Sequence, residues 1–159
     1  MKTIFAFAFV VAMILCFGCS SEDCLESGPP IAEYLQDTSK TFSQDPVEFI
    51  DENGNGTGLF YIIDTPGDTV TPNASSTITF TYDGKTTNDE TFTATGDSVQ
   101  TLPLSGLIPA WRLALPLIGQ GGEIQLFVPA NLAYGSNQAA EICPNSDLIF
   151  DVNLIGVEN

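Results

Sequence analysis

The side chains that could do chemistry here are 20 carboxylates, four cysteines, four tyrosines and one tryptophan, and none of the 159 residues is histidine. The absence of imidazole removes Ser-His-Asp and Cys-His catalysis and most zinc sites. The acidic run over residues 51–56 matches the first half of a calcium loop, but its twelfth position is Ile62, where a glutamate is required. We favour a simple turn there, and we expect no metal and no cofactor.

The N-terminal residues predict export. Lys2 precedes an apolar, uncharged stretch over residues 4–17 that is too short for a comfortable bilayer span, so a signal peptide is favoured over a transmembrane helix. The stretch ends in Leu-Cys-Phe-Gly-Cys, which resembles the bacterial lipobox, although Phe17 is larger than usual at its position. We predict a lipoprotein signal peptide over residues 1–18 and lipidation of Cys19. The alternative is an ordinary signal peptide cut near Gly18, with Cys19 a plain cysteine.

The charge of the chain restricts its partners. The net charge is −16, and cleavage after residue 18 removes Lys2 but no carboxylate. A chain this acidic is repelled by phosphate, which argues against nucleic acid. Charge also opposes binding to anionic lipid, so membrane attachment would come from acyl chains. We expect an exported protein, lipid-anchored to a bacterial membrane and most reasonably the outer one, with periplasmic or surface orientation left open.

Two further cysteines, Cys24 and Cys143, stay with the folded chain after the signal is removed and Cys19 is acylated. An exported chain lives in an oxidising space, where two such thiols can form one disulfide. The alternative is two unpaired cysteines, because sequence does not show whether they come within bonding distance. We favour the disulfide, which would tie the N-terminal segment to the folded domain.

The region over residues 19–57 is predicted to be an acidic tether with a short helix. Residues 20–30 are polar and carry Pro and Gly, as is typical of a flexible segment. Pro30 opens a helical pattern over residues 31–36, in which Ile31, Tyr34 and Leu35 share one face. Residues 44–58 read as a second linker.

From Leu59 the hydrophobic pattern changes to the two-residue period of half-buried strands. Strands are expected over residues 59–64, 77–82, 90–95, 99–104, 123–128 and 148–155. Residues 107–115 instead have helical spacing, and Pro116 ends or kinks that helix. The pattern predicts an α+β domain over residues 58–159, in which one short helix packs across a curved antiparallel sheet of five to six strands.

Four blocks in the C-terminal half form a recognisable signature: residues 107–111 (LIPAW), 119–123 (GQGGE), 128–135 (VPANLAYG) and 144–152 (PNSDLIFDV). With Tyr82-Asp83-Gly84 and Phe92 upstream, their order and spacing resemble the FKBP family of prolyl isomerases over about 100 residues. The tether-plus-helix leader also resembles FKBP-type lipoproteins of the Bacteroidetes kind.

The resemblance implies catalysis without a nucleophile. Rotation about an X-Pro bond faces a barrier of about 18–20 kcal/mol because amide resonance must be broken. An apolar pocket and a few donors at the twisted carbonyl favour that state. The resemblance places Trp111 at the pocket floor, the N–H of Ile108 and the phenol of Tyr134 at substrate carbonyls, and Ile142 in the loop over the site. The walls would be Tyr82, Phe92, Leu107, Ile108 and Phe150. Without the family, these aromatic residues would be read as ordinary core.

One departure separates two functional hypotheses. Thr93 stands where the family usually has an aspartate that helps polarise the site. The first hypothesis is a peptidyl-prolyl cis-trans isomerase that assists the folding of exported proteins by acting on their proline-containing segments, with activity reduced by Thr93. The alternative is a catalytically weak or inactive FKBP-like peptide-binding or chaperone lipoprotein. A third, an acidic adhesive lipoprotein, is disfavoured by the four blocks. Client proteins and oligomeric state are not predicted.

Overall fold

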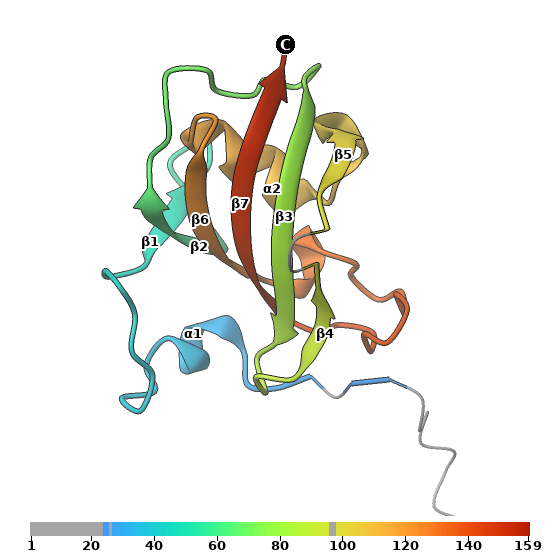
Figure 1. Ribbon diagram of the computed structural model, residues 1–159. Helices are drawn as coiled ribbons and strands as arrows, with labels where there is room; N and C mark the ends of the chain where they lie inside the picture. Colours follow the sequence, from blue (N-terminus) through green and yellow to red (C-terminus); the bar gives the residue numbers. More distant parts are fainter. Residues whose placement is uncertain (1–23, 26, 96–97) are drawn as a thin grey trace, which may run out of the picture.

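The protein is described here from a computed structural model that covers residues 24–25, 27–95 and 98–159 (Figure 1). The predicted signal peptide and Cys19 lie outside the described residues. No helix within those residues is long and apolar enough to cross a membrane. The main architecture is one antiparallel sheet with a short helix, α2 (Pro109–Ala114), across one face.

The sheet has seven strands among the described residues, in the order β1-β2-β6-β7-β3-β4, with β5 also paired to β3. Every strand pair is antiparallel. The strands are β1 (Val47–Ile50), β2 (Gly56–Thr65), β3 (Thr77–Thr86), β4 (Thr91–Ala94), β5 (Gln100–Pro103), β6 (Gly122–Val128) and β7 (Leu148–Glu158). The predicted fold class is therefore confirmed, with β1 as the additional strand.

Strands β4 and β5 share one edge of β3. Residues Asp83 to Lys85 of β3 pair with β4, and Thr77 to Phe80 pair with β5. Tyr82 lies between these two paired stretches of β3. The hydroxyl of Thr95 accepts a hydrogen bond from the Tyr82 N–H and donates one to the Tyr82 carbonyl, each 2.8 Å long. Thr95 thus satisfies the backbone where the ladder is interrupted, and it fixes the strand that carries Tyr82.

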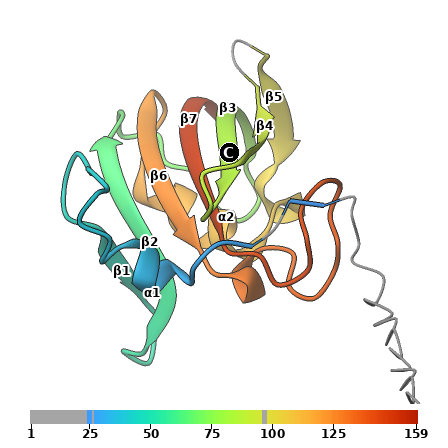
Figure 2. The same ribbon diagram turned by 90° about the horizontal axis from the view of Figure 1, so that it is seen from below.

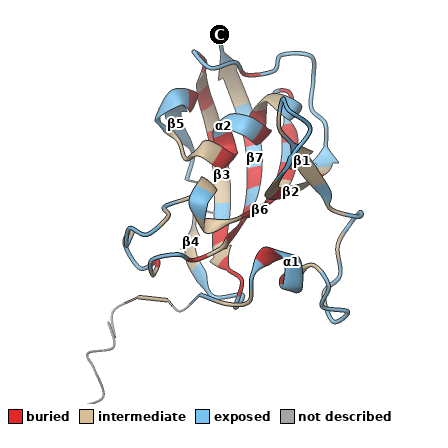
Figure 3. Ribbon diagram, turned by 180° about the vertical axis from the view of Figure 1, so that it is seen from behind, coloured by how far each residue is buried: buried red, intermediate tan, exposed pale blue. Residues whose placement is uncertain are grey.

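The main core lies between the sheet and α2, which Figure 3 shows in front of β3 and β7. Alternation along β7 buries Leu148, Phe150, Val152 and Leu154 and exposes Asp151 and Asn153, as predicted. Ile149 breaks that pattern, since it points to the other face and is nevertheless buried. That face carries a second cluster, in which Ile62, Phe127 and Ile149 pack against Ile31, Tyr34 and Phe42.

The N-terminal segment before β1, which we call the leader, is therefore packed against the sheet and is more than a tether. Helix α1 (Ile31–Tyr34) is a single turn, shorter than the helical pattern over residues 31–36. Ile31 and Tyr34 are 3% and 4% exposed, because they cover the second face of the sheet. The Tyr34 phenol donates to Asp89 at 2.7 Å, which ties α1 to the β3–β4 connection. Burial, followed by this hydrogen bond and the nearby carboxylates, raises the pKa of Tyr34 above its ordinary value.

The expectation of a linker over residues 44–58 is wrong, because β1 and the start of β2 form a hairpin there. The acidic run at its tip is a turn, as favoured. The Asp51 carboxylate accepts the backbone N–H groups of Asn53 and Asn55, each at 2.8 Å, and Gly54 adopts a φ of 83°. The Asn55 hydrogen bonds lower the pKa of Asp51. No group of three or more His, Cys, Asp or Glu among the described residues is arranged to hold a metal ion.

Candidate functional site

An apolar pocket of about 120 Å³ opens between α2, β3, β5 and the segment after β6. Its lining consists mainly of aromatic and aliphatic side chains: Phe80, Tyr82, Gln100, Leu102, Leu107, Ile108, Trp111, Tyr134 and Phe150. Six of the eight residues predicted for the site line it, namely Tyr82, Leu107, Ile108, Trp111, Tyr134 and Phe150. The roles assigned to them stay predictions.

Trp111 forms the rigid base of this group. Its ring lies edge-to-face against Phe80, Tyr82 and Phe150, with ring centroids 5.2, 5.2 and 5.4 Å apart. Edge-to-face pairs at these separations are favourable and directional. Trp111 is 4% exposed, and its buried indole N–H has no hydrogen-bond partner among the described residues. The four rings together form a closely packed aromatic box.

The start of α2 supplies a backbone donor beside the pocket. Ile108 is the N-cap residue, and Pro109 fixes the first helical position. The Ile108 carbonyl accepts the N–H groups of Trp111 and Arg112. The Ile108 N–H itself donates to no protein group among the described residues. A backbone N–H left unpaired next to an apolar pocket is suited to bind a carbonyl oxygen that enters it.

Tyr134 supplies a second donor at the rim. It follows the short 3-10 helix η3 (Ala130–Leu132) and is 37% exposed. Burial, with a smaller contribution from Tyr82, raises the pKa of the Tyr134 phenol above its ordinary value. The phenol therefore stays protonated, and able to donate, over the whole physiological pH range.

Two predicted site residues lie outside the lining. Phe92 stands behind the pocket, with its ring 5.7 Å from that of Phe150. It fits there because Gly84 has no side chain: a Cβ at Gly84 would come within 2.5 Å of the Phe92 ring. Ile142 is 4% exposed and packs into the main core. Phe92 therefore contacts the pocket wall through Phe150, whereas Ile142 is a core residue of the segment that follows Tyr134.

Three lining residues were missed from the sequence: Phe80, Gln100 and Leu102. Phe80 shares the inward face of β3 with Tyr82, so the alternation of that strand could have indicated it. Gln100 and Leu102 lie opposite Phe80 and Ile78 in the β3–β5 ladder. Their position depends on the register of β5, which a loosely patterned four-residue strand does not reveal.

A second hollow, of about 230 Å³, lies on the opposite side of Tyr82 and is bordered by Asp64, Asp83, Glu123 and Asp151. It is larger but polar, and it lacks the mixture of apolar walls and converging donors that characterises sites for small ligands. We therefore take the aromatic pocket as the candidate site.

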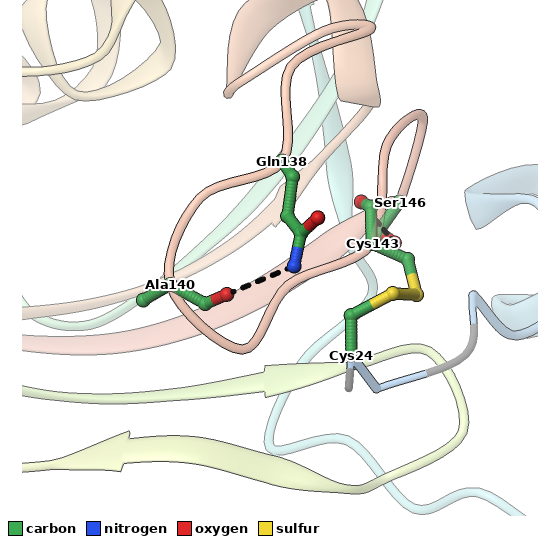
Figure 4. Close-up of a disulfide and its surroundings, with 5 residues drawn as sticks. All are labelled: Cys24, Gln138, Ala140, Cys143 and Ser146. Carbon is green, nitrogen blue, oxygen red and sulfur yellow. Dashed lines mark hydrogen bonds between the residues drawn. A yellow bond between two sulfur atoms is a disulfide. The ribbon is translucent and has the colours of Figure 1, made fainter. Parts of the chain in front are cut away.

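The structure contains a disulfide between Cys24 and Cys143, with the two Cα atoms 5.1 Å apart (Figure 4). Of the two alternatives left open by the sequence, the paired one is present. Cys143 lies in the segment over residues 133–147, which begins beside Tyr134 and ends at β7. The leader and the pocket rim are thus covalently connected.

Comparison with known proteins gives consistent matches. The family model for FKBP-type peptidyl-prolyl cis-trans isomerases matches residues 68–155. The isomerase FkpA of Buchnera aphidicola subsp. Schizaphis graminum is 42% identical over 108 residues, which cover 64% of this chain and 42% of that protein. The outer membrane protein MIP of Legionella longbeachae is 38% identical over 104 residues, covering 64% and 45%.

A solved structure matches over a longer stretch. The crystal structure of FkpA from Escherichia coli has a TM-score of 0.66 and 30% sequence identity, and the match covers 80% of this chain and 57% of that one. The chain spans less than half the length of the two curated relatives named above.

Proposed function

The chain belongs to the FKBP-type peptidyl-prolyl cis-trans isomerase family, and from that premise we propose that it catalyses cis–trans isomerisation of X-Pro bonds in exported polypeptides. The observation that carries the proposal is the aromatic box of Trp111, Tyr82 and Phe150 beside two available donors. The proline ring enters the box, and the carbonyls on either side of it meet the N–H of Ile108 and the phenol of Tyr134.

The proposed mechanism rests on selective stabilisation of the twisted amide. Water stabilises the planar, polar amide, so transfer of the X-Pro bond into an apolar pocket reduces the barrier to rotation. Donors held by the scaffold add to the effect when they fit the carbonyl better in the twisted state. No bond is made or cut, so a chain without histidine meets the chemical requirements.

The experiment that tests the proposal is the isomerisation of a proline peptide by the full chain, compared with Tyr82→Phe. Tyr82 lines the pocket and contacts Trp111. We expect the wild type to accelerate isomerisation and Tyr82→Phe to lose part of that acceleration. Equal rates with and without the wild-type protein would reject the proposal.

The reaction should be nearly independent of pH. The described residues that line the pocket include no carboxylate or amine, the chain has no histidine, and the raised pKa of Tyr134 keeps its phenol protonated. We expect kcat/KM to vary by less than about twofold between about pH 6 and pH 9, the range in which histidine and thiols titrate. A rate-against-pH profile with a clear bell shape would point to an acid–base step that the proposed mechanism lacks.

Thr93 is proposed to limit the rate, since the family usually has an aspartate there. Thr93 lies on β4, next to the Phe92 that supports Phe150. A carboxylate introduced at this position, opposite Gly84 of β3, adds a charge to the strand that carries Phe92, and we propose that this charge polarises the pocket, so Thr93→Asp should raise kcat/KM by about three- to tenfold. Thr93→Ser is the matched control and should leave the rate unchanged. A lower rate in Thr93→Asp would mean that the threonine is not the limiting feature.

The second candidate function is a peptide-binding or chaperone module, and Thr93 is the observation that favours it. In that case proline peptides would still enter the pocket and quench the fluorescence of Trp111, but isomerisation would not accelerate. The comparison between binding and turnover in one sample therefore separates the two functions.

We also propose that the protein is a lipoprotein, organised as a signal peptide over residues 1–18, a leader over 19–57 and the isomerase domain over 58–159. The motif ending in Cys19 supports this, and one relative is named an outer membrane protein. The Cys19→Ser variant should leave the membrane fraction, since acyl chains would be the anchor. A variant that stays with the membrane would show that another anchor holds the protein.

A further inference from the structure

The segment over residues 133–147 holds one side of the pocket through Tyr134, and it contains no strand or α-helix. Its two ends are tied together. The N–H of Gly135 donates to the Ala130 carbonyl at 2.8 Å, and the N–H of Asn145 donates to the Gly135 carbonyl at 2.7 Å. We call this segment the rim loop. Tyr134 thus lies at the closed neck of the rim loop, directly before Gly135.

The far end of the rim loop has a backbone conformation that needs support. Ala140 has a φ of 49°, in the left-handed region that alanine seldom adopts. It lies in a turn in which Ala139 and Ile142 exchange backbone hydrogen bonds of 3.2 and 2.8 Å. Such a conformation persists where the surrounding structure over-determines it. The support here comes from outside the loop.

The leader provides that support. Leu25 forms a parallel bridge with Ile142, its N–H donates to the Glu141 carbonyl at 2.6 Å, and its carbonyl accepts the Cys143 N–H at 3.4 Å. The Cys24–Cys143 disulfide lies beside this pairing (Figure 4). Figure 2 shows the leader running from α1 past the rim loop. The leader therefore acts as a short extra strand along the far side of the rim loop.

The leader is itself fixed at its other end. At Gly28 it passes so close to the β3–β4 connection that a Cβ would lie 2.4 Å from the backbone of Thr87 and Asn88. The Asp147 carboxylate accepts the Ile31 N–H at 3.0 Å and the Ala130 N–H at 2.8 Å. One side chain thus connects α1 to η3, the element that leads into Tyr134. The rim loop is held between two fixed points.

We propose that Cys24 and Cys143 are positioning residues for the reaction: their disulfide clamps the leader onto the rim loop and so keeps the phenol of Tyr134 at the pocket. This inference rests on the proposed function of the pocket. It makes the leader a part of the substrate-binding unit, and it predicts that opening the disulfide weakens substrate binding through Tyr134 while the aromatic box of Trp111 stays intact.

A double-mutant cycle tests the inference. In the full chain, Cys24→Ser/Cys143→Ser should lower kcat/KM about tenfold, because small misplacements of a binding group are costly. In a Tyr134→Phe background the same change should have an effect of less than about twofold, since the group it positions is already absent. An equal loss in both backgrounds, or no loss in either, would overturn the proposal.

A matched control excludes a general loss of stability. Asn73 lies far from the rim loop, where its side chain accepts the Ser75 N–H at 2.9 Å and donates to Asn159 at 2.9 Å. Asn73→Ala should therefore destabilise the chain and leave kcat/KM unchanged. If the serine pair does not fold, the folded wild type is reduced with a phosphine, which opens the disulfide to two thiols, and is then assayed in the same way.

Hydrogen exchange gives a second readout that does not depend on turnover. Opening the disulfide should speed exchange at the amides of Leu25, Ile142 and Asn145 by more than it speeds exchange at the amides of β6 and β7, which follow the free energy of global unfolding. Unchanged exchange in the rim loop would overturn the clamp even in an active protein. If opening the disulfide speeds exchange in the rim loop but even the wild-type protein does not accelerate isomerisation, the proposed function is rejected and the clamp is retained.

Discussion

Trp111→Ala should lower kcat/KM on the order of 100-fold, because the box loses the ring against which Phe80, Tyr82 and Phe150 are set edge-to-face. The same substitution should lower the free energy of unfolding by about 3–5 kcal/mol, as is usual when a buried aromatic ring is removed. The isomerisation rate is measured well below the unfolding midpoint of the variant, so that the folded fraction does not limit it.

The matched control for this variant is Phe127→Ala. Phe127 is buried to a similar degree, but it points to the other face of the sheet, against Tyr34 and Phe42. Phe127→Ala should lower the free energy of unfolding by a comparable amount and leave the isomerisation rate of the folded protein within about twofold of the wild type. If both variants lose activity in proportion to stability, Trp111 has no role of its own in the pocket.

Removal of the Cys24–Cys143 disulfide should lower the free energy of unfolding by about 4 kcal/mol, because the bridge closes a long loop in the unfolded chain. The two cysteines are 119 residues apart in the sequence, so the constraint on the unfolded state is large. Urea unfolding of Cys24→Ser/Cys143→Ser, followed through the fluorescence of Trp111, measures the change.

Reduction of the wild type provides the control for that measurement, since it opens the same bridge without a substitution. The reduced wild type and the serine variant should unfold at similar urea concentrations. A change below about 1 kcal/mol in both would show that the hydrogen bonds of Leu25, Ile31 and Tyr34 hold the leader without the bridge.

The sheet and its main core were predictable because the alternation of apolar and polar residues along a strand is a strong signal where one face of the sheet is buried and the other is exposed. Residues 148–154 and 123–128 show this alternation clearly, and they form most of β7 and β6, respectively. Phe80 was on the predicted inward face of β3, although it was not assigned to the pocket. Helix α2 was indicated by the helical spacing of Ile108, Trp111 and Leu115, although it begins at Pro109 rather than at residue 107.

The parts that were missed depend on contacts between distant segments. β1 is a four-residue edge strand whose pairing with β2 is visible only in the fold. The leader carries turn-forming and acidic residues typical of a tether, and its order comes from Asp147, Asp89 and Cys143, which lie more than 50 residues away. Local composition does not encode such contacts, because it reflects only the conformational preference of each short segment.

The most direct test of the pocket as a prolyl isomerase is a single sample in which binding and turnover are measured together. A proline peptide is mixed with a small amount of the full chain, its cis–trans exchange is followed by NMR, and the quenching of Trp111 fluorescence is recorded at the same time. We predict both quenching and exchange faster than in the peptide alone, and we expect the faster exchange to be lost in Trp111→Leu, which has no tryptophan left to quench. Quenching without faster exchange would contradict the isomerase and leave a peptide-binding protein.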